Sequence, residues 1–347
     1  MEVELNTGME RRRRPITLLG LVFTALGVVL FSFLVYSVGP EEIAANIVDF
    51  GVVGFTVILA LYGLRLLCRA TAWHLSVSDP DYLPLRNTFP AVVLGEAVSS
   101  MVPLGILISG TTKAVAVRKR VSLVVGFSSV ATENIFYSVV TSVFLIAGAI
   151  TFAAAFPLDE AWSWTLRVLV AITSGVLLFL IVMVVRQWHF ASATVGWLHA
   201  HGVGRRVLDG GREKVRLFED LVYGFYRQHR NRFLPILLFE CAFHLLGVAE
   251  VWFILSRIHG SASLFNGFVL ESVSRTVSIV FKFVPFMVGV DEAGSHFVAE
   301  VLGIGAAIGV TLAIIRKGRI LFWALVGLVI MARRGLGLEH IFSSHAE

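Results

Sequence analysis

Charged side chains are placed within the most apolar stretches of this 347-residue chain. The segment FKFVPFMVGVDEAGSHFVAE, residues 281–300, is the clearest case. Each ionised side chain at the centre of a bilayer costs about 2.5–3.5 kcal/mol on insertion scales, so such residues turn towards a polar interior. There they can form a hydrated path and hydrogen-bond a polar ligand in place of water. The main candidates for such a path are Glu133, Lys282, Asp291, Glu292, Arg316 and Arg319.

Four further charged residues are weaker candidates for the same path: Arg65, Arg69, Glu96 and Lys113. Arg65 and Arg69 are four residues apart, on one helix face, where they either bind a lipid phosphate or extend to the membrane interface. Glu96 either lines the path or lies at the interface. Lys113 either contacts an anionic group or is an interfacial cation near Arg118.

Motifs of known catalytic or cofactor sites do not accompany these charges. The chain contains no HExxH, Asp-rich diphosphate motif, G-x-S-x-G or GxxxxGK[ST]. Asp291 and Glu292 as a catalytic pair are an alternative that no other residue supports. Cys68 and Cys241 lie in apolar runs and are expected to pack in the interior. We therefore expect no metal, no cofactor and no nucleic-acid partner.

The composition indicates that the chain folds in a lipid bilayer. Hydrophobic residues make up 56% of the chain and charged residues 15%, with a mean hydropathy of +0.81, which excludes an ordinary water-soluble domain. Runs long enough to cross a bilayer lie at about 16–38, 51–78, 121–156, 162–185, 233–256 and 303–332. Alternation with period two is not sustained, so helices are favoured over a barrel. This predicts an all-α polytopic membrane protein with about six spanning helices in a single membrane domain, residues 1–334.

Positive charges predict the orientation, because lysine and arginine accumulate in short cytoplasmic loops. The clusters are Arg11–Arg14, residues 118–120, residues 186–232, and Arg333–Arg334. All four can be cytoplasmic at once, which places both termini, and the tail 335–347, in the cytoplasm.

The segment 188–232 is predicted to be a cytoplasmic insertion. Its second half has apolar residues on one helical face, namely Val215, Phe218, Leu221, Val222 and Phe225. This predicts an amphipathic helix at the inner membrane surface. A solvated connector is favoured over recognition of anionic head groups.

Two parts of the chain, about 51–156 and 233–332, share one layout. Each has an apolar helix, a hairpin broken at a Val-Pro, and a long helix with a central charge, so that Glu133 corresponds to Arg316. A single helix between the two parts adds one membrane crossing, so the second part is expected to have the opposite orientation in the membrane to the first. The layout predicts inverted repeats, which are typical of secondary transporters.

Each hairpin is predicted to be re-entrant, with ordinary spanning helices as the alternative. Residues 286–301 are too short and too polar to span alone, and irregular backbone at membrane depth requires a cover of protein or water. Gly289 and Gly294 are expected to bend the tip. Lys282 either faces Asp291 across the hairpin or lies at the interface.

The sequence VPFMVGVDEAG followed by LAIIRKGRILFWALVGL resembles the flippase-like membrane domain of lysylphosphatidylglycerol synthases and its stand-alone relatives, including proteins associated with hopanoid synthesis. LRLLCRATAW and ATENIFYSVV resemble its Arg-rich and Glu-containing helices, so the resemblance covers most of 15–334. The first hairpin, MVPLGILISGTTK, departs from the family in having no carboxylate after Pro103.

This resemblance implies a bacterial or archaeal cytoplasmic membrane protein whose partner is a lipid: a phospholipid, an aminoacylated lipid or an isoprenoid-type amphiphile. The soluble aminoacyltransferase domain of the synthases has no counterpart here, so synthase chemistry is not expected. We expect a flippase-like transporter that moves a lipid head group through a polar cavity between the hairpins. A membrane-embedded lipid-modifying enzyme and a scaffold for biosynthetic enzymes are the alternatives, and an oligomer is compatible with all three.

Overall fold

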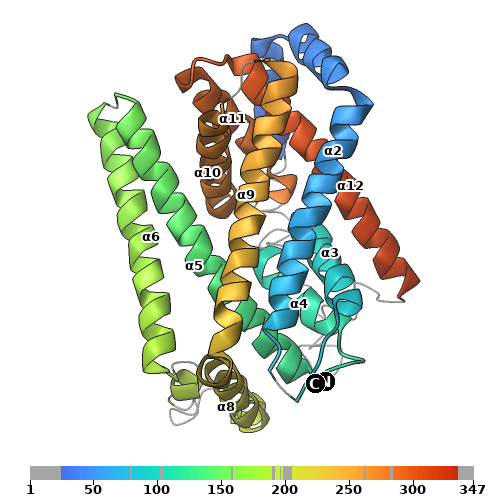
Figure 1. Cartoon of the computed structure of the whole chain (residues 1–347), viewed down its shortest axis with the longest axis vertical. Helices are drawn as coiled ribbons and strands as arrows, with labels where there is room; N and C mark the ends of the chain where they lie inside the picture. Colours follow the sequence, from blue (N-terminus) through green and yellow to red (C-terminus); the bar gives the residue numbers. More distant parts are fainter. Residues whose placement is uncertain are drawn as a thin grey trace. The chain divides into compact units, whose positions relative to one another are not determined.

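The computed structural model describes residues 25–334, apart from residues 79, 102–104, 158, 190, 191, 196, 198–204, 261, 262, 282 and 283, and gives only the backbone of residues 105–107, 162 and 205–212. Lys282, Pro103, the Arg11–Arg14 cluster and the tail 335–347 therefore lie outside the described residues. Every regular element in the described part is helical (Figure 1). The prediction of an all-α polytopic membrane protein is confirmed.

The helices follow the order of the predicted layout. They are Ala25–Val38, α2 (Pro40–Leu75), α3 (Leu85–Met101), α4 (Gly105–Ala116), α5 (Leu123–Ala155), α6 (Glu160–Arg186), α8 (Arg205–Gln228), α9 (Phe233–Ile258), α10 (Leu264–Val280), α11 (Val290–Val301) and α12 (Ala306–Arg333). Short 3-10 turns occupy Arg230–Arg232 and Pro285–Met287.

Four helices are both long enough and apolar enough to cross a membrane: Pro40–Leu75, Leu123–Ala155, Ser163–Arg186 and Arg230–Ile258. The predicted span 303–332 is also one continuous helix, α12, whose 28 residues extend about 42 Å at 1.5 Å per residue. Arg316 and Arg319 lie within it, as predicted, and not in a loop.

α2 contains a kink that the sequence did not predict. Gly51 has φ 64° and ψ 178°, a conformation that a residue without a Cβ adopts easily, and it joins two helical segments. Residues 40–50, which lie between the predicted spans 16–38 and 51–78, are helical, and the second segment of α2 corresponds to the predicted span from residue 51.

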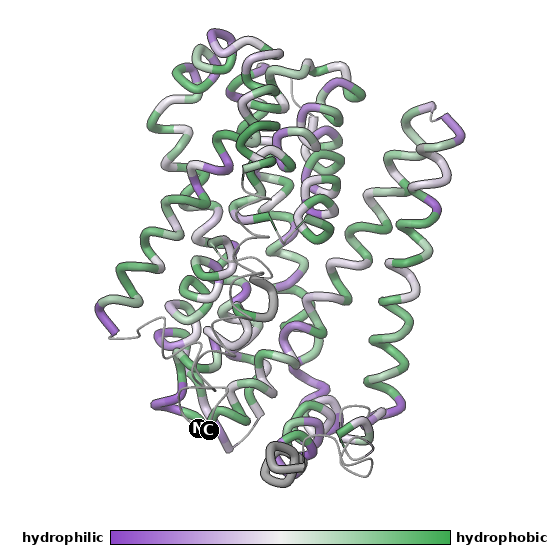
Figure 2. Tube along the Cα trace, turned by 180° about the vertical axis from the view of Figure 1, so that it is seen from behind, coloured by the Kyte–Doolittle hydropathy of each residue, from purple (hydrophilic) through white to green (hydrophobic). Residues whose placement is uncertain are grey.

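α6 identifies lipid as the surrounding medium. It lies beside α5 (Figure 1), is strongly apolar along most of its length (Figure 2), and has no buried residue among those described. A helix so apolar, with no buried residue, is stable only where lipid covers its surface.

Cys241 of α9 is exposed, so the expectation that it packs in the interior was wrong.

Both hairpins consist of a 17-residue helix followed by a 12-residue helix: α3 with α4, and α10 with α11. The second helix of each pair extends only about 18 Å and does not span a bilayer of about 30 Å alone. α10 and α11 pack directly on each other. Re-entry of either hairpin stays a prediction.

The two glycines of the second hairpin have different roles. Gly289 precedes α11 with φ 83° and turns the chain, as predicted. Gly294 lies inside α11, where a Cβ would be 3.1 Å from Cγ2 of Val277. Gly294 therefore permits close packing of α10 on α11, and the expectation that it bends the tip was wrong.

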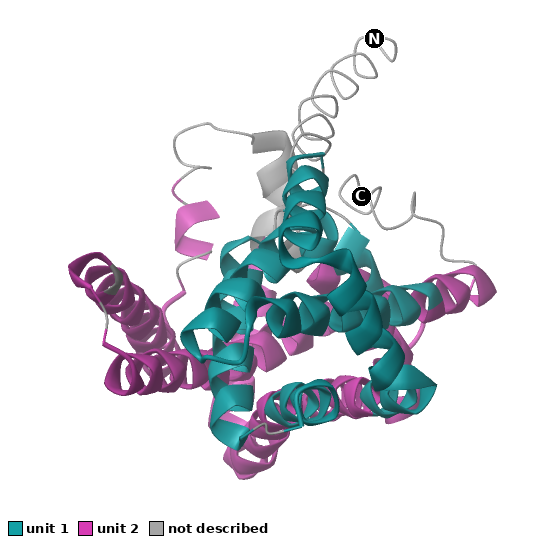
Figure 3. Cartoon of the chain, turned by 90° about the horizontal axis from the view of Figure 1, so that it is seen from above, with its two compact units in different colours: residues 1–60, 97–107, 248–325 teal, residues 61–96, 108–247, 326–347 magenta. Residues whose placement is uncertain are grey.

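The chain divides into two compact units, coloured separately in Figure 3. Unit 1 comprises Met1–Ala60, Ala97–Leu107 and Val248–Leu325, and unit 2 comprises Leu61–Glu96, Ile108–Gly247 and Val326–Glu347. Each unit takes helices from both predicted repeats, because α2, α9 and α12 pass from one unit into the other.

The predicted amphipathic helix is α8, and it belongs to unit 2. Its apolar face packs against other helices of the protein. The buried cluster there combines residues of α2, α5 and α9 with Val222, Tyr223, Phe225 and Tyr226 of α8. Phe136 of α5 stacks on Tyr226, with ring centroids 5.3 Å apart. α8 is therefore a packed part of the fold.

The close packing of α12 on α11 gives a test of the fold. A Cβ at Gly309 would lie 2.3 Å from the carbonyl oxygen of Ser295, so Gly309→Leu should destabilise the protein by about 1–3 kcal/mol or more. A thermal unfolding curve in detergent measures the loss. Gly175→Leu on α6 is the control, because nothing lies within 4 Å of its Cβ position. Equal unfolding midpoints for the two variants would contradict this packing.

Candidate functional site

Each compact unit contains its own cluster of buried charges. In unit 1 the cluster is formed by Glu250, Glu271, Arg275, Asp291, Glu292, Arg316, Lys317 and Arg319. In unit 2 it is formed by Arg69, Lys113, Glu133 and Glu240, with Arg65 and Glu96 nearby. The predicted candidates are thus divided between the clusters, with Lys282 outside the described residues.

In unit 1 the cations of α12 are held by carboxylates of α9 and α10. Arg319 donates from Nη1 to Oε1 of Glu250. Arg316 donates from Nη2 to Oε2 of Glu271 at 2.7 Å, and its Nε lies 3.9 Å from Oε1 of Glu250. Arg275 binds the other oxygen of Glu271 at 2.9 Å. These buried pairs fix α9, α10 and α12 relative to one another within unit 1, since a buried charge without its partner is costly.

Glu292 is held by its own helix and by α12. Its Oε2 accepts a hydrogen bond from the backbone N–H of Gly289 at 2.8 Å, which caps the first turn of α11. Its Oε1 binds Nζ of Lys317 at 2.5 Å. Lys317 also donates to the carbonyl of Met287 at 3.3 Å. Both oxygens of Glu292 are therefore engaged within the protein, and Lys317 is its cationic partner among the described residues.

Asp291 and Arg316 keep polar groups that no described residue satisfies. Asp291 is 5% exposed and makes no hydrogen bond or ion pair with any residue that the structure describes. Arg316 is 7% exposed, and its Nη1 and Nε donate no hydrogen bond. The Asp291 carboxylate acts electrostatically on Arg316. Within the part of unit 1 that the structure describes, one carboxylate and one guanidinium edge thus have no hydrogen-bond partner. Both can contact a ligand of mixed charge.

Glu133 is the centre of the unit 2 cluster. Its Oε1 accepts from Nε of Arg69 at 2.7 Å and lies 2.5 Å from Nη2. Nζ of Lys113 is 3.5 Å from its Oε2. The Arg69 guanidinium also packs over the ring of Tyr137, 4.0 Å from the centroid. Lys113 is buried in the protein, beside Glu133.

The other charges of unit 2 differ in environment. Glu240 of α9 is 0% exposed, and its closest cationic atom among the described residues is Nε of Arg69, at 4.0 Å. Lys113 acts on it from further away. Arg65 is buried against the ring of Phe243 at 4.5 Å, so it does not extend to the interface. Glu96 is exposed on α3 and accepts from the hydroxyl of Tyr62 at 3.0 Å.

A cavity of about 420 Å³ lies between α5, α6 and α8 in unit 2. Most of its lining is apolar or aromatic, with Asn134, Ser138 and Glu219 as polar exceptions. Asn134 also accepts from Nη2 of Arg69 at 3.3 Å, so it separates the cavity from the charge cluster. An apolar cavity with a few convergent polar groups is the usual form of a ligand site.

Two tyrosine hydroxyls of α8 stay protonated: Tyr223, which lines this cavity, and Tyr226, which lies in the buried cluster beside it. Burial raises the pKa of Tyr223 and of Tyr226, which disfavours the phenolate. The Tyr223 hydroxyl donates to the carbonyl of Trp188 at 2.6 Å. These hydroxyls therefore attach α8 to the rest of unit 2 and are not acid or base groups near neutral pH.

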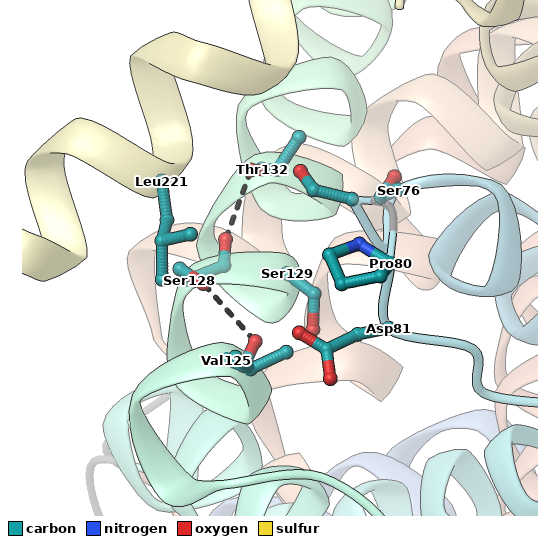
Figure 4. A pocket seen from close by; sticks show the side chains of 9 residues that line it. Ser76, Pro80, Asp81, Val125, Ser128, Ser129, Thr132 and Leu221 are labelled. Atoms are coloured by element: carbon teal, nitrogen blue, oxygen red, sulfur yellow. Dashed lines mark hydrogen bonds between the residues drawn. The ribbon is translucent and has the colours of Figure 1, made fainter.

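A second, smaller cavity of about 70 Å³ lies between α5, α8 and the end of α2 (Figure 4). Hydroxyls line it, but Ser76, Ser128 and Thr132 each donate to a backbone carbonyl of their own helix. Its volume suits about two water molecules.

Among the described residues no group of three or more His, Cys, Asp or Glu residues could hold a metal ion.

Three buried carboxylates of the two clusters are absent from the predicted site residues: Glu240, Glu250 and Glu271. Glu240 and Glu250 are visible in the sequence as charges within an apolar run, but the sequence alone assigns them no role. Each is an isolated charge in a helical apolar stretch, which is the criterion that selected Glu133. The same criterion, applied to α9 and α10, would have found all three. Their partners could not be assigned from sequence, because each pair joins residues more than 40 positions apart.

The pairing of Arg319 with Glu250 predicts a stability effect. Arg319→Met should lower the free energy of unfolding by about 3–5 kcal/mol, because it leaves buried Glu250 without its closest partner. The double variant Arg319→Met/Glu250→Gln should recover part of that loss. Unfolding midpoints for the two single variants and the double variant measure the coupling. Strictly additive effects would contradict the pairing.

Comparison with known families gives one match. The model of the lysylphosphatidylglycerol synthase transmembrane region matches residues 17–328, most of the chain. Comparisons with curated proteins and with solved structures give no match. The match agrees with the apolar helices and the buried charges of both units, and it relates the protein to membrane lipids. The chain therefore belongs to the family of the lysylphosphatidylglycerol synthase transmembrane region.

Proposed function

We propose that this protein is a flippase-like transporter that moves the head group of a membrane lipid across the bilayer. The observation that carries the proposal is the incomplete pair Asp291 and Arg316, both buried in unit 1. A guanidinium edge suits a phosphodiester, and a carboxylate suits an ammonium or hydroxyl group. Together they match a phospholipid head group, including an aminoacylated one.

The remaining charges of unit 1 supply the rigid support that such a site requires. Glu271 and Glu250 orient Arg316 from one side, and Glu292 holds the first turn of α11, on which Asp291 lies. A site whose polar groups are oriented in advance replaces head-group hydration at a lower cost of ordering. Arg319 and Glu292, predicted as path residues, are assigned to this supporting role.

Unit 2 supports the same function with a second polar site. Arg69 donates to Asn134 at the edge of the cavity of about 420 Å³, whose apolar lining suits the hydrocarbon part of an amphiphile. We assign Arg69, Lys113 and Glu133 to the lipid path in this unit. We also propose that the protein lies in the cytoplasmic membrane with both termini inside, because this orientation leaves the lysine and arginine clusters in the cytoplasm.

A liposome assay tests the transport function. The full chain, reconstituted in vesicles with a head-group-labelled phospholipid, should accelerate movement of the label between leaflets. Asp291→Asn and Arg316→Gln should each lower this rate about tenfold or more, since loss of one charged hydrogen bond costs about 1.5–3 kcal/mol. Asp49→Asn and Arg257→Gln are matched controls, because both residues are exposed.

The outcomes separate the alternatives. Rates equal to wild type in both site variants, with folded protein, would remove Asp291 and Arg316 from the path. No acceleration by the wild-type protein with any labelled phospholipid would contradict the function itself. Conversion of the lipid to a new species, detected by mass spectrometry of the same vesicles, would identify a lipid-modifying enzyme instead.

A further inference from the structure

Glu240 is the carboxylate that the ion pairs of unit 2 leave unsatisfied. It is 0% exposed, and neither of its oxygens accepts a hydrogen bond from the part of the chain that the structure describes. Its nearest cationic atom, Nε of Arg69, is 4.0 Å away. An ionised carboxylate without a hydrogen-bond donor is strongly disfavoured in a buried, apolar setting, and binding a proton removes that cost.

Glu133 offers the complementary acceptor. Its Oε1 takes the hydrogen bond of Arg69, but its Oε2 accepts none. Both carboxyl groups lie within 4.0 Å of Nε of Arg69 and interact with each other. One proton held between the two carboxyl groups would neutralise Glu240 and would supply a donor that both groups can share. Glu133 also keeps Nζ of Lys113 at 3.5 Å from its Oε2.

We propose that Glu133 and Glu240 share one bound proton, and that this proton is coupled to lipid transport. The coupling part of this inference rests on the proposed function, whereas the proton site does not. The charged or titratable groups around the pair are Arg65, Cys68 and Arg69 of α2, Glu96 of α3, Lys113 of α4, Tyr137 of α5, and Cys241 and His244 of α9.

Arg69 is the link between the proton and the lipid. It binds Glu133 through Nε and donates through Nη2 to Asn134, which lines the cavity. An anionic head group entering from the cavity would draw Arg69 away from Glu133, and the carboxyl pair would then hold its proton more tightly. Because such coupling is reciprocal, protonation must favour binding of the anionic lipid to the same extent.

Infrared spectroscopy tests the proton site without any transport. Full-length protein in phosphatidylcholine nanodiscs should show the carbonyl band of a protonated carboxyl group at neutral pH, and Glu240→Gln should remove it. Glu133→Gln should also remove it, because Glu240 then gains Arg69 and ionises. Asp49→Asn should leave the band unchanged. A band that persists in both glutamate variants, or no band in the wild type, would overturn the shared proton.

Vesicles with labelled phosphatidylglycerol test the coupling. Wild-type transport should be about fivefold faster or more in vesicles with a pH gradient than in vesicles without one, a factor typical of coupled sites. Glu240→Gln should respond to the gradient no more than protein-free vesicles. Wild-type transport that ignores the gradient would overturn the coupling alone. No transport under any condition would contradict the proposed function and leave the infrared result to decide the proton site.

Discussion

The cost of a buried charge is the constraint on which the rest of this structure depends. In helices surrounded by lipid an ionised side chain must find an opposite charge inside the protein or bind a proton. Arg316 and Arg319 meet this condition through Glu250 and Glu271, and Glu133 meets it through Arg69 and Lys113. Within each unit the helices that carry these residues are therefore fixed in register, because sliding one of them would separate a buried pair.

The two clusters use the same positions with opposite signs. In the first predicted repeat the cation Arg69 lies on the entering helix and Glu133 on the long final helix. In the second, Glu250 lies on the entering helix and the cation Arg316 on the final one. Each cluster satisfies the same physical constraint, yet among the described residues each keeps polar groups without a hydrogen-bond partner. These are one edge of Arg316, with Asp291, in unit 1, and the carboxyl group of Glu240 in unit 2. We assign the lipid head group to the groups of unit 1 and a proton to Glu240.

Much of this fold could be predicted from the sequence, because lipid imposes simple rules. Apolar length located the spanning helices, and the run 303–332, with Arg316 near its middle, is one continuous helix, α12. What could not be predicted depends on tertiary pairing. The kink at Gly51, the packing role of Gly294 and the partner of Glu292 are all set by neighbours distant in sequence or by local backbone geometry. The sequence therefore identified most of the candidate residues as buried charges. It could not show which of these charges are fully paired, because that depends on tertiary contacts.

A structure of the protein in lipid nanodiscs tests the central claim most directly, because it shows what satisfies the charges that the protein itself leaves open. The account predicts density for a lipid head group against Asp291 and the Nη1 edge of Arg316, with Glu271 still bound to Arg316. It would be contradicted if these two groups were satisfied by protein side chains alone and all ordered lipid lay on the outer surface of the helices.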